Sequence, residues 1–494
     1  MAEPRAQPRR SAPPLLGWLG WAGFDAIGRL VLLTGSTIVF TRLVTPRDFG
    51  VAALVLTIVT MAATFVGAPF EEALAQRRHV RMVHFRAALG ASMATGAAIF
   101  LLSIAAAPAF GAYYGEASIA WLLPAAMTQI FFSGHSDIAT ALARRQRRFN
   151  DVACATLCGH VVGVAVSLAL AFAGYALWAL VMQRPLIMFA RAVILHARLP
   201  HAIGPTWAPA HAAEFGRFAS MSFLSRLIEN LSYVCFNNVV GLLYSLETLG
   251  QFNMAMRLIE PIRGAVVATG HNLAFSFFAR AGHDPGRLRD LAGHVVAQAA
   301  LVTAPVFVGL AAIATHILPV VAGSGWEPAA HIAICLSLGG ALAVPAGLLF
   351  TAFSATGRPE MSVASLALGL VGIVAALVLL HPLGPISVGL SRLVGDAIRA
   401  GFAILAPSGA LGWTRGARAG ALRTAWVMSA AMGAIVASFS GVVDDMGPAF
   451  ALAAMMGIGV VSYLALLAVG ARDSFFALLA HLPRRGAGLQ NGAR

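Results

Sequence analysis

The sequence predicts an all-α, polytopic membrane protein with about 14 transmembrane helices, in two pseudo-symmetric six-helix bundles plus two C-terminal helices. The first observation is composition: 59% of the 494 residues are hydrophobic and only 11% are charged, whereas about a quarter of a soluble domain is charged. The second is a succession of apolar stretches of about 20 residues, the length that crosses a bilayer core. The third is an alternation of arginine-rich and arginine-free connections. Together these observations exclude a soluble enzyme, a disordered protein and a nucleic-acid-binding module.

The basic residues also fit a membrane protein. All 34 are arginine, and with 20 acidic residues they give a net charge of +14. We assign the excess to cytoplasmic loops, which collect basic residues, and expect no nucleic-acid partner. The four cysteines lie in apolar stretches and form no CxxC pair, so we expect neither disulfides nor a bound metal. The sequence has no GxxxxGK[ST], GxSxG or HExxH motif, and we therefore expect no cofactor and no enzymatic activity.

The predicted spans follow one another with short connections. In order they are 15–40, 49–70, 86–109, 117–139, 152–173, 175–196, 215–243, 248–278, 291–322, 329–352, 361–381, 385–407, 423–443 and 448–470. A cytoplasmic N-terminus requires arginine in every second connection, and it is found in the tail and at 77–86, 144–148, 280–289, 358, 415–418 and 484–485. Only Arg42 and Arg47, in the first outside loop, break this pattern. We therefore predict that both termini are cytoplasmic.

An internal repeat predicts the two bundles. Gly50 and Gly250 lie 200 positions apart, and each opens a span after a similar polar segment, TPRDFG or SLETLG. Residues 148–150 and 358–360 match at an offset of 210, as do Gly174 and Gly384. We divide the chain into a cytoplasmic tail (1–14), an N-terminal bundle (15–200), a cytoplasmic linker (201–214), a C-terminal bundle (215–410) and two extra helices with a cytoplasmic tail (411–494). Parallel repeats of this kind predict a site between the bundles near the midplane.

Charged residues inside predicted spans mark the candidate site, because each costs about 2.5–3.5 kcal/mol at the centre of a span. They share helix faces with other polar residues in four spans. The first span has Asp25 and Arg29, the seventh has Arg226, Glu229, Asn230, Tyr233 and Asn237, and the twelfth has Arg392, Asp396 and Arg399. The eighth has Asn253, Arg257, Glu260 and Gly264, with Arg263 beside this stripe, and Arg184 precedes a proline in the sixth. Arginine suits phosphate or pyrophosphate because it stays charged and forms forked hydrogen bonds. Embedded carboxylates can take up a proton or a cation. The alternative interpretation is that pairs such as Asp25–Arg29 and Arg392–Asp396 only neutralise themselves so that the helix can insert.

Several segments resemble a known family. Residues 41–50 (TRLVTPRDFG) are similar to the signature that follows the first span of bacterial polysaccharide exporters. Residues 249–258 (LGQFNMAMRL), 325–330 (GWEPAA), 356–360 (TGRPE) and 143–149 (ARRQRRF) resemble other motifs of the same family. It is the polysaccharide-transporter family of lipid-linked oligosaccharide flippases, within the multidrug/oligosaccharidyl-lipid/polysaccharide superfamily. Phe252 stands where the family usually has Tyr, and Leu246 replaces an expected Pro.

The resemblance implies a function and a location. It implies alternating-access transport of undecaprenyl-pyrophosphate-linked oligosaccharide repeats across the bacterial inner membrane, for exopolysaccharide, O-antigen or capsule. We expect the headgroup to be bound by Arg29, Arg184, Arg226, Asn230, Arg257 and Arg263, of which only Arg257 lies inside a family motif. We expect Asp25, Glu229 and Glu260 to couple transport to a proton or sodium ion. The implied partners are the lipid-linked substrate, membrane lipids, and a polysaccharide polymerase and co-polymerase.

Three alternatives remain open at this point. A cation-coupled multidrug exporter of the same superfamily would favour an acidic, aromatic cavity, whereas these polar stripes are richer in arginine. A lipid II flippase would share the fold, but the loop motifs favour the polysaccharide branch. A membrane polysaccharide polymerase or ligase would need a large outside loop with catalytic groups, and the outside loops here are short.

Overall fold

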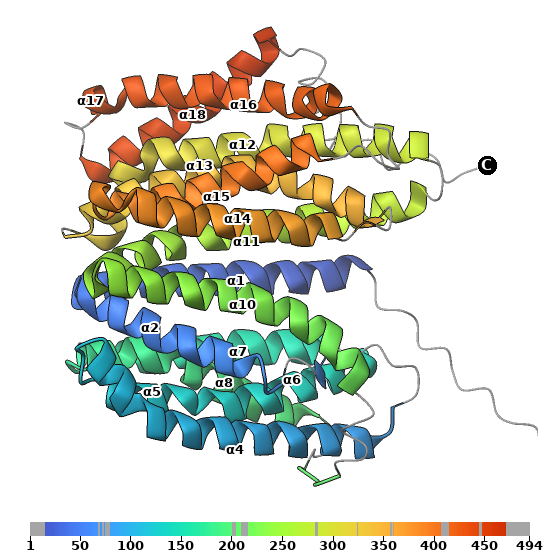
Figure 1. Cartoon of the computed structure of the whole chain (residues 1–494), viewed down its shortest axis with the longest axis vertical. Coiled ribbons are helices and arrows are strands. Elements are labelled where there is room, and N and C mark those ends of the chain that lie inside the picture. Colours follow the sequence, from blue (N-terminus) through green and yellow to red (C-terminus); the bar gives the residue numbers. More distant parts are fainter. Residues whose placement is uncertain are drawn as a thin grey trace, which may run out of the picture. The chain divides into compact units, whose positions relative to one another are not determined.

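The computed structural model describes residues 15–67, 70–71, 74, 80–199, 204–208, 216–281, 285–323, 325–355, 358, 360–406, 414–443 and 447–470. In these ranges the secondary structure is helical, without strands (Figure 1). Nine helices in this part of the chain are long and apolar enough to cross a membrane. The all-α membrane fold is therefore confirmed, while the count of 14 spans and the two-bundle layout stay predictions of the sequence.

The chain forms two compact units, Met1–Gly250 and Gln251–Arg494. The first contains α1 (Leu15–Leu43), α2 (Pro46–Ala63), α4 (Met82–Tyr113), α5 (Ile119–Met127), α6 (Gln129–Arg145), α7 (Phe149–Phe172), α8 (Ala176–Arg198) and α10 (Gly216–Leu243). The helix α11 (Leu246–Ala281) begins in the first unit and continues into the second. The second unit continues with α12 (Pro285–Ala322), α13 (Glu327–Ala355), α14 (Glu360–Leu379), the short 3-10 helix η1 (His381–Leu383), α15 (Ile386–Leu405), α16 (Arg415–Ser438), α17 (Ser440–Val443) and α18 (Pro448–Gly470).

One predicted span is two helices. The stretch predicted as a single span over 117–139 forms α5 and α6, which meet at Thr128. Pro124 lies inside α5, and a proline removes one backbone hydrogen bond from the helix it interrupts. At the junction the Thr128 hydroxyl donates to the carbonyl of Ala125 at 2.7 Å. The apolar stretch that composition presents as one span is therefore two helices that meet at Thr128.

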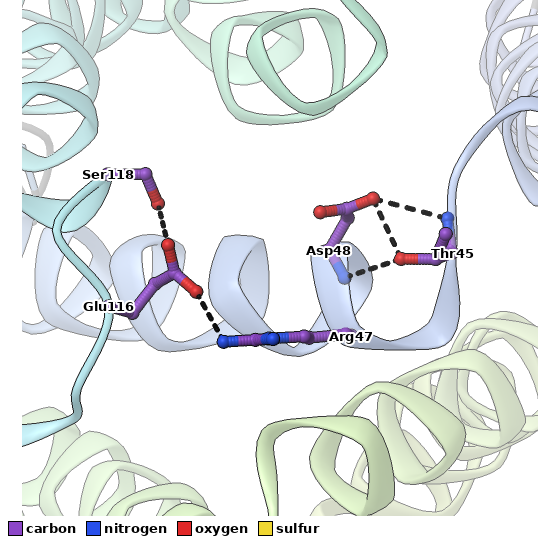
Figure 2. Close-up of polar contacts among 5 residues, drawn as sticks. All are labelled: Thr45, Arg47, Asp48, Glu116 and Ser118. Carbon is purple, nitrogen blue, oxygen red and sulfur yellow. Dashed lines mark hydrogen bonds and ion pairs between the residues drawn. The ribbon is translucent and has the colours of Figure 1, made fainter.

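The TPRDFG segment has a structural explanation at the start of α2 (Figure 2). The Thr45 hydroxyl accepts a hydrogen bond from the Asp48 N–H at 3.2 Å, and the Asp48 carboxylate accepts one from the Thr45 N–H at 3.4 Å. This reciprocal pair is a capping box, which satisfies backbone donors that the first helical turn leaves free. Pro46 occupies the first turn, where its missing N–H costs nothing.

Arg47, an arginine that breaks the loop pattern, is neutralised in the same place. Its guanidinium donates to a Glu116 carboxylate oxygen at 3.1 Å, and Ser118 donates to the other oxygen at 2.9 Å (Figure 2). The pair joins the start of α2 to the connection between α4 and α5. Arg47 therefore helps to hold this end of the first unit together.

The start of α11 repeats the cap of α2. Ser245 accepts from the Thr248 N–H at 3.0 Å, as Thr45 does from Asp48. The two glycines that the repeat pairs also contact each other's helix. A Cβ on Gly50 would lie 1.7 Å from the Leu246 carbonyl oxygen, and one on Gly250 would lie 1.7 Å from that of Pro46. Glycine is therefore required at both positions, because the backbones of α2 and α11 touch there.

Candidate functional site

Polar side chains of three neighbouring helices meet within the first unit. Helix α2 packs against both α8 and α10, and in Figure 1 α10 runs beside α2. From α8, Arg184 donates to the Thr60 hydroxyl of α2 at 2.9 Å. From α10, Asn230 donates through Nδ2 to the Thr64 hydroxyl, one turn further along the chain, at 2.8 Å. We call Thr60, Thr64, Arg184 and Asn230 the α2 polar face.

The threonines of this face can present acceptors because their own hydroxyl protons are already used. Thr60 donates to the carbonyl of Leu56 at 2.8 Å, and Thr64 donates to that of Thr60 at 3.1 Å. Each hydroxyl oxygen then accepts from the incoming Arg184 or Asn230. Beside them, Gln183 donates to Ser36 of α1 at 3.2 Å. Polar contacts therefore join α8 to both α1 and α2, and α10 to α2.

Arg184 is the charged residue of this face. It is the ninth residue of the 23-residue α8, or about 12 Å from the start of the helix at 1.5 Å per residue. The side chain is exposed. Among the residues that the structure describes, no carboxylate pairs with Arg184. A charged side chain in a span faces the interior of a bundle or water rather than lipid, and the neighbours of Arg184 fit that arrangement.

Arg263 has the opposite environment in the second unit. Its guanidinium donates from α11 to both carboxylate oxygens of Asp396 on α15, at 3.1 Å each. Arg399 lies 3.8 Å from the same carboxylate, and the Arg263 and Asp396 side chains are only 13% and 7% exposed. Asp396, which shares a helix face with Arg392 in the sequence, is thus paired with Arg263 of a different helix. Arg263 therefore has a carboxylate partner.

The remaining predicted site residues fall into two groups. Arg29 and Arg257 are half-buried, Glu260 is exposed, and all three make interactions with neighbouring groups. The side chains of Asp25, Arg226 and Glu229 lie outside the described part of the structure. The structure therefore brings together Arg184 and Asn230 of the predicted set, and it places Arg263 with Asp396 instead.

Sequence reasoning missed the hydroxyl groups of α2. Thr57, Thr60 and Thr64 recur at helical spacing, and this spacing could have indicated a polar stripe. Ser36 lies two turns beyond Arg29 on the face that begins with Asp25, and this spacing indicates it, whereas Gln183 belongs to no such stripe. No group of three or more His, Cys, Asp or Glu residues within the described ranges could hold a metal ion.

At the end of α4, a further contact joins this helix to α10. The Tyr114 hydroxyl donates to the Asn238 side-chain oxygen. Burial, and secondarily the neighbouring Tyr113, raises the pKa of Tyr114 to about 12. The phenol therefore stays protonated near neutral pH and remains a hydrogen-bond donor.

Comparisons with known proteins identify relatives of the chain. A family model described as polysaccharide biosynthesis protein matches residues 39–331. The succinoglycan biosynthesis transport protein ExoT of Rhizobium meliloti (strain 1021) is 22% identical over 327 residues, 66% of each chain. The teichuronic acid biosynthesis protein TuaB of Bacillus subtilis (strain 168) is 20% identical over 274 residues, 54% of this chain and 56% of TuaB. The chain thus spans less than two thirds of the length of either relative.

Solved structures show the fold. The lipid II flippase MurJ in an inward closed conformation matches 93% of this chain and 99% of its own, with a TM-score of 0.74 and 14% identity. An inward-facing multidrug resistance transporter of the MATE family matches 81% of this chain and 99% of its own, with a TM-score of 0.57 and 14% identity.

The helices and their internal polar residues define a multi-pass α-helical membrane protein with the fold of MurJ and the MATE transporters. Because the family model covers more than half of the residues, the chain belongs to the polysaccharide biosynthesis protein family. The resemblance to polysaccharide transporters that the sequence motifs indicate is confirmed.

Proposed function

We propose that this protein is a flippase or exporter of undecaprenyl-pyrophosphate-linked oligosaccharide repeats, acting in the bacterial inner membrane for exopolysaccharide, O-antigen or capsule synthesis. Family membership supports the class of function. ExoT is a biosynthesis transport protein and MurJ is a lipid II flippase, and both support the same class of function. In this proposal the protein is not an enzyme, both termini are cytoplasmic, and a polymerase and co-polymerase act on the delivered repeats.

The observation that carries the proposal is Arg184 on the α2 polar face, which is exposed and has no carboxylate partner among the described residues. A pyrophosphate carries negative charge and several acceptor oxygens, and a guanidinium can bind two of these oxygens at once. Arg184 already uses one N–H on Thr60, which orients the side chain and leaves further donors. Asn230 supplies a neutral amide nearby for a phosphate or a sugar hydroxyl. Arg29, Arg226, Arg257 and Arg263 are the other headgroup ligands that we propose.

The same observation argues against a drug exporter. Among the described residues of this region, a cationic drug would meet the Arg184 guanidinium and no carboxylate paired with it, and like charges repel. An anionic headgroup is attracted by the same charge.

The energy source is the second part of the proposal. Asp25, Glu229 and Glu260 are our candidates for binding a proton or sodium ion. One charge moving through 100 mV supplies about 2.3 kcal/mol, which is enough to bias the exchange between inward-open and outward-open forms.

A complementation experiment tests the proposal. In a strain from which the gene is deleted, we expect surface polymer to be lost and lipid-linked repeats to accumulate facing the cytoplasm. Wild-type protein should restore export, and Arg184→Gln should reduce it by about 10- to 100-fold, the loss of about 1.5–3 kcal/mol from a charged hydrogen bond.

The matched control is Arg191→Gln. Arg191 lies on the same helix and also donates to a threonine hydroxyl, that of Thr140 at 2.9 Å, but on α6 rather than on the α2 polar face. This variant should retain export at equal protein level. Normal polymer in the deletion strain, with increased sensitivity to cationic dyes, would instead favour the drug exporter.

A further inference from the structure

The last two predicted spans are built into the core of the second unit. The sequence presents them as an addition to a pair of six-helix bundles, but their side chains belong to one buried cluster with residues of α12, α13 and α15. The members that α16 and α18 contribute are Leu422, Ala425, Met432, Val436, Ala451, Met455, Tyr463 and Leu467. Burial of these apolar side chains explains why α16 and α18 pack against the second unit. It does not explain the polar contacts that the two helices make there.

The first polar contact is at a proline in α13. Pro345 has no N–H, so the carbonyl of Ala341, four residues earlier, cannot form its usual helical hydrogen bond. The indole Nε1 of Trp426 on α16 donates to this carbonyl at 3.0 Å. An unsatisfied carbonyl away from water is costly, and Trp426 supplies the missing donor.

The second contact repeats the first with different residues. Pro305 interrupts α12 and leaves the carbonyl of Leu301 without its helical donor. The hydroxyl of Tyr463 on α18 donates to that carbonyl at 2.6 Å. Tyr463 is 8% exposed and Leu301 is 6% exposed, so water has little access to this bond.

A third contact caps the end of α15. Arg418 of α16 is 1% exposed, and its guanidinium donates to the carbonyls of Ala403 at 3.0 Å and Ala406 at 2.6 Å. The last carbonyls of a helix have no partners within the helix, and a cation there also complements the helix dipole. The guanidinium carbon lies 5.9 Å from the centre of the Phe353 ring of α13.

We infer that α16 and α18 form a brace for two proline breaks of the second unit. Trp426 and Tyr463 satisfy the carbonyls that Pro345 and Pro305 leave without a helical donor. Each aromatic donor replaces one N–H that a proline lacks, and Arg418 caps the neighbouring helix end. The brace keeps the interrupted helices α12 and α13 in one packed arrangement. It concerns the second unit alone and does not rest on the proposed function.

A double-mutant cycle tests the brace. Trp426→Phe keeps a ring but removes the donor, so it orphans the Ala341 carbonyl. Pro345→Ala restores the backbone N–H, so the carbonyl regains its helical bond. We expect Trp426→Phe alone to lower the thermal unfolding midpoint of the purified full-length protein in detergent by about 1–3 °C. In the Pro345→Ala background the same substitution should lower it by much less, and the pair Tyr463→Phe and Pro305→Ala should behave in the same way.

Crossed pairs provide the control. Trp426→Phe should cost the same with Pro305→Ala as without it, because these residues belong to different contacts. If Trp426→Phe cannot be purified folded, recovery of folded protein in Trp426→Phe/Pro345→Ala is the supporting result. An equal loss with and without Pro345→Ala would overturn the inference, since it would mean that Trp426 acts through ring packing alone.

Discussion

The Asp396 carboxylate forms ion pairs with two arginines, Arg263 of α11 and Arg399 of its own helix α15. A buried carboxylate in a span is stable as an anion only when its charge is balanced and its oxygens are hydrogen-bonded. Both oxygens of Asp396 accept from Arg263. In the proposed transport cycle, Arg263 must therefore leave this carboxylate before it can bind an anionic headgroup.

The pair predicts a large asymmetry between single and double substitutions. Asp396→Asn removes the charge that balances the buried Arg263, and removing one partner of a buried pair costs about 3–5 kcal/mol. Asp396→Asn/Arg263→Gln should recover much of that loss. The free energy of unfolding of each purified variant in detergent measures the loss and its recovery.

The exposed pair Arg47–Glu116 serves as the reference for this measurement. Its arginine is 63% exposed, and Glu116→Gln should cost only about 1 kcal/mol or less. A double variant at Asp396 and Arg263 that is no more stable than Asp396→Asn would contradict the pairing.

At the scale of the helix, the start of α2 and the start of α11 are fitted to each other. Both have a hydroxyl N-cap, and Gly50 and Gly250 allow the backbones to approach until no Cβ fits between them. The motif residues 45–50 therefore stabilise the fold of the first unit. Thr45 and Asp48 form the cap, Arg47 pairs with Glu116, and Phe49 and Gly50 are buried.

This contact predicts which helical glycines tolerate alanine. Gly50→Ala should reduce the yield of folded protein severely, because the new Cβ would lie 1.7 Å from a carbonyl oxygen of the neighbouring backbone. A Cβ on Gly35 in α1 would have no heavy atom within 4 Å. Gly35→Ala should therefore leave the free energy of unfolding unchanged or raise it by up to about 1 kcal/mol. Size-exclusion profiles of the two variants distinguish these outcomes, and equal profiles would contradict the backbone contact.

For the whole molecule, composition and arginine placement were enough to predict an all-α membrane protein, because a bilayer leaves the backbone few alternatives. The motifs were enough to indicate the family. Which helix Asp396 pairs with was not predictable, since spacing along α15 favours Arg392 and only tertiary packing brings Arg263 to it. The side chains that donate to the carbonyls orphaned by Pro305 and Pro345 were not predictable for the same reason. A proline in the sequence indicates which carbonyl lacks its donor, but not which distant helix supplies one.

The candidate site was predictable only in part. Arg184 stands out in the sequence because a charge in a span is rare and costly, and Asn230 stands out through the polar stripe of its helix. The threonines that orient them lie on α2, a helix without charges in its central turns. Their role depends on the neighbours of α2, which no pattern within one helix contains.

The central claim, transport of a pyrophosphate-linked oligosaccharide through the region of Arg184, is tested most directly with purified protein in liposomes. The measurement is the rate at which a fluorescent undecaprenyl-pyrophosphate oligosaccharide, enclosed in the inner leaflet, becomes accessible to an external quencher. We predict rapid exposure with wild type and Arg191→Gln, and a rate about 10- to 100-fold lower with Arg184→Gln. A wild-type rate equal to that of empty liposomes would contradict the function, and equal rates for wild type and Arg184→Gln would contradict the site.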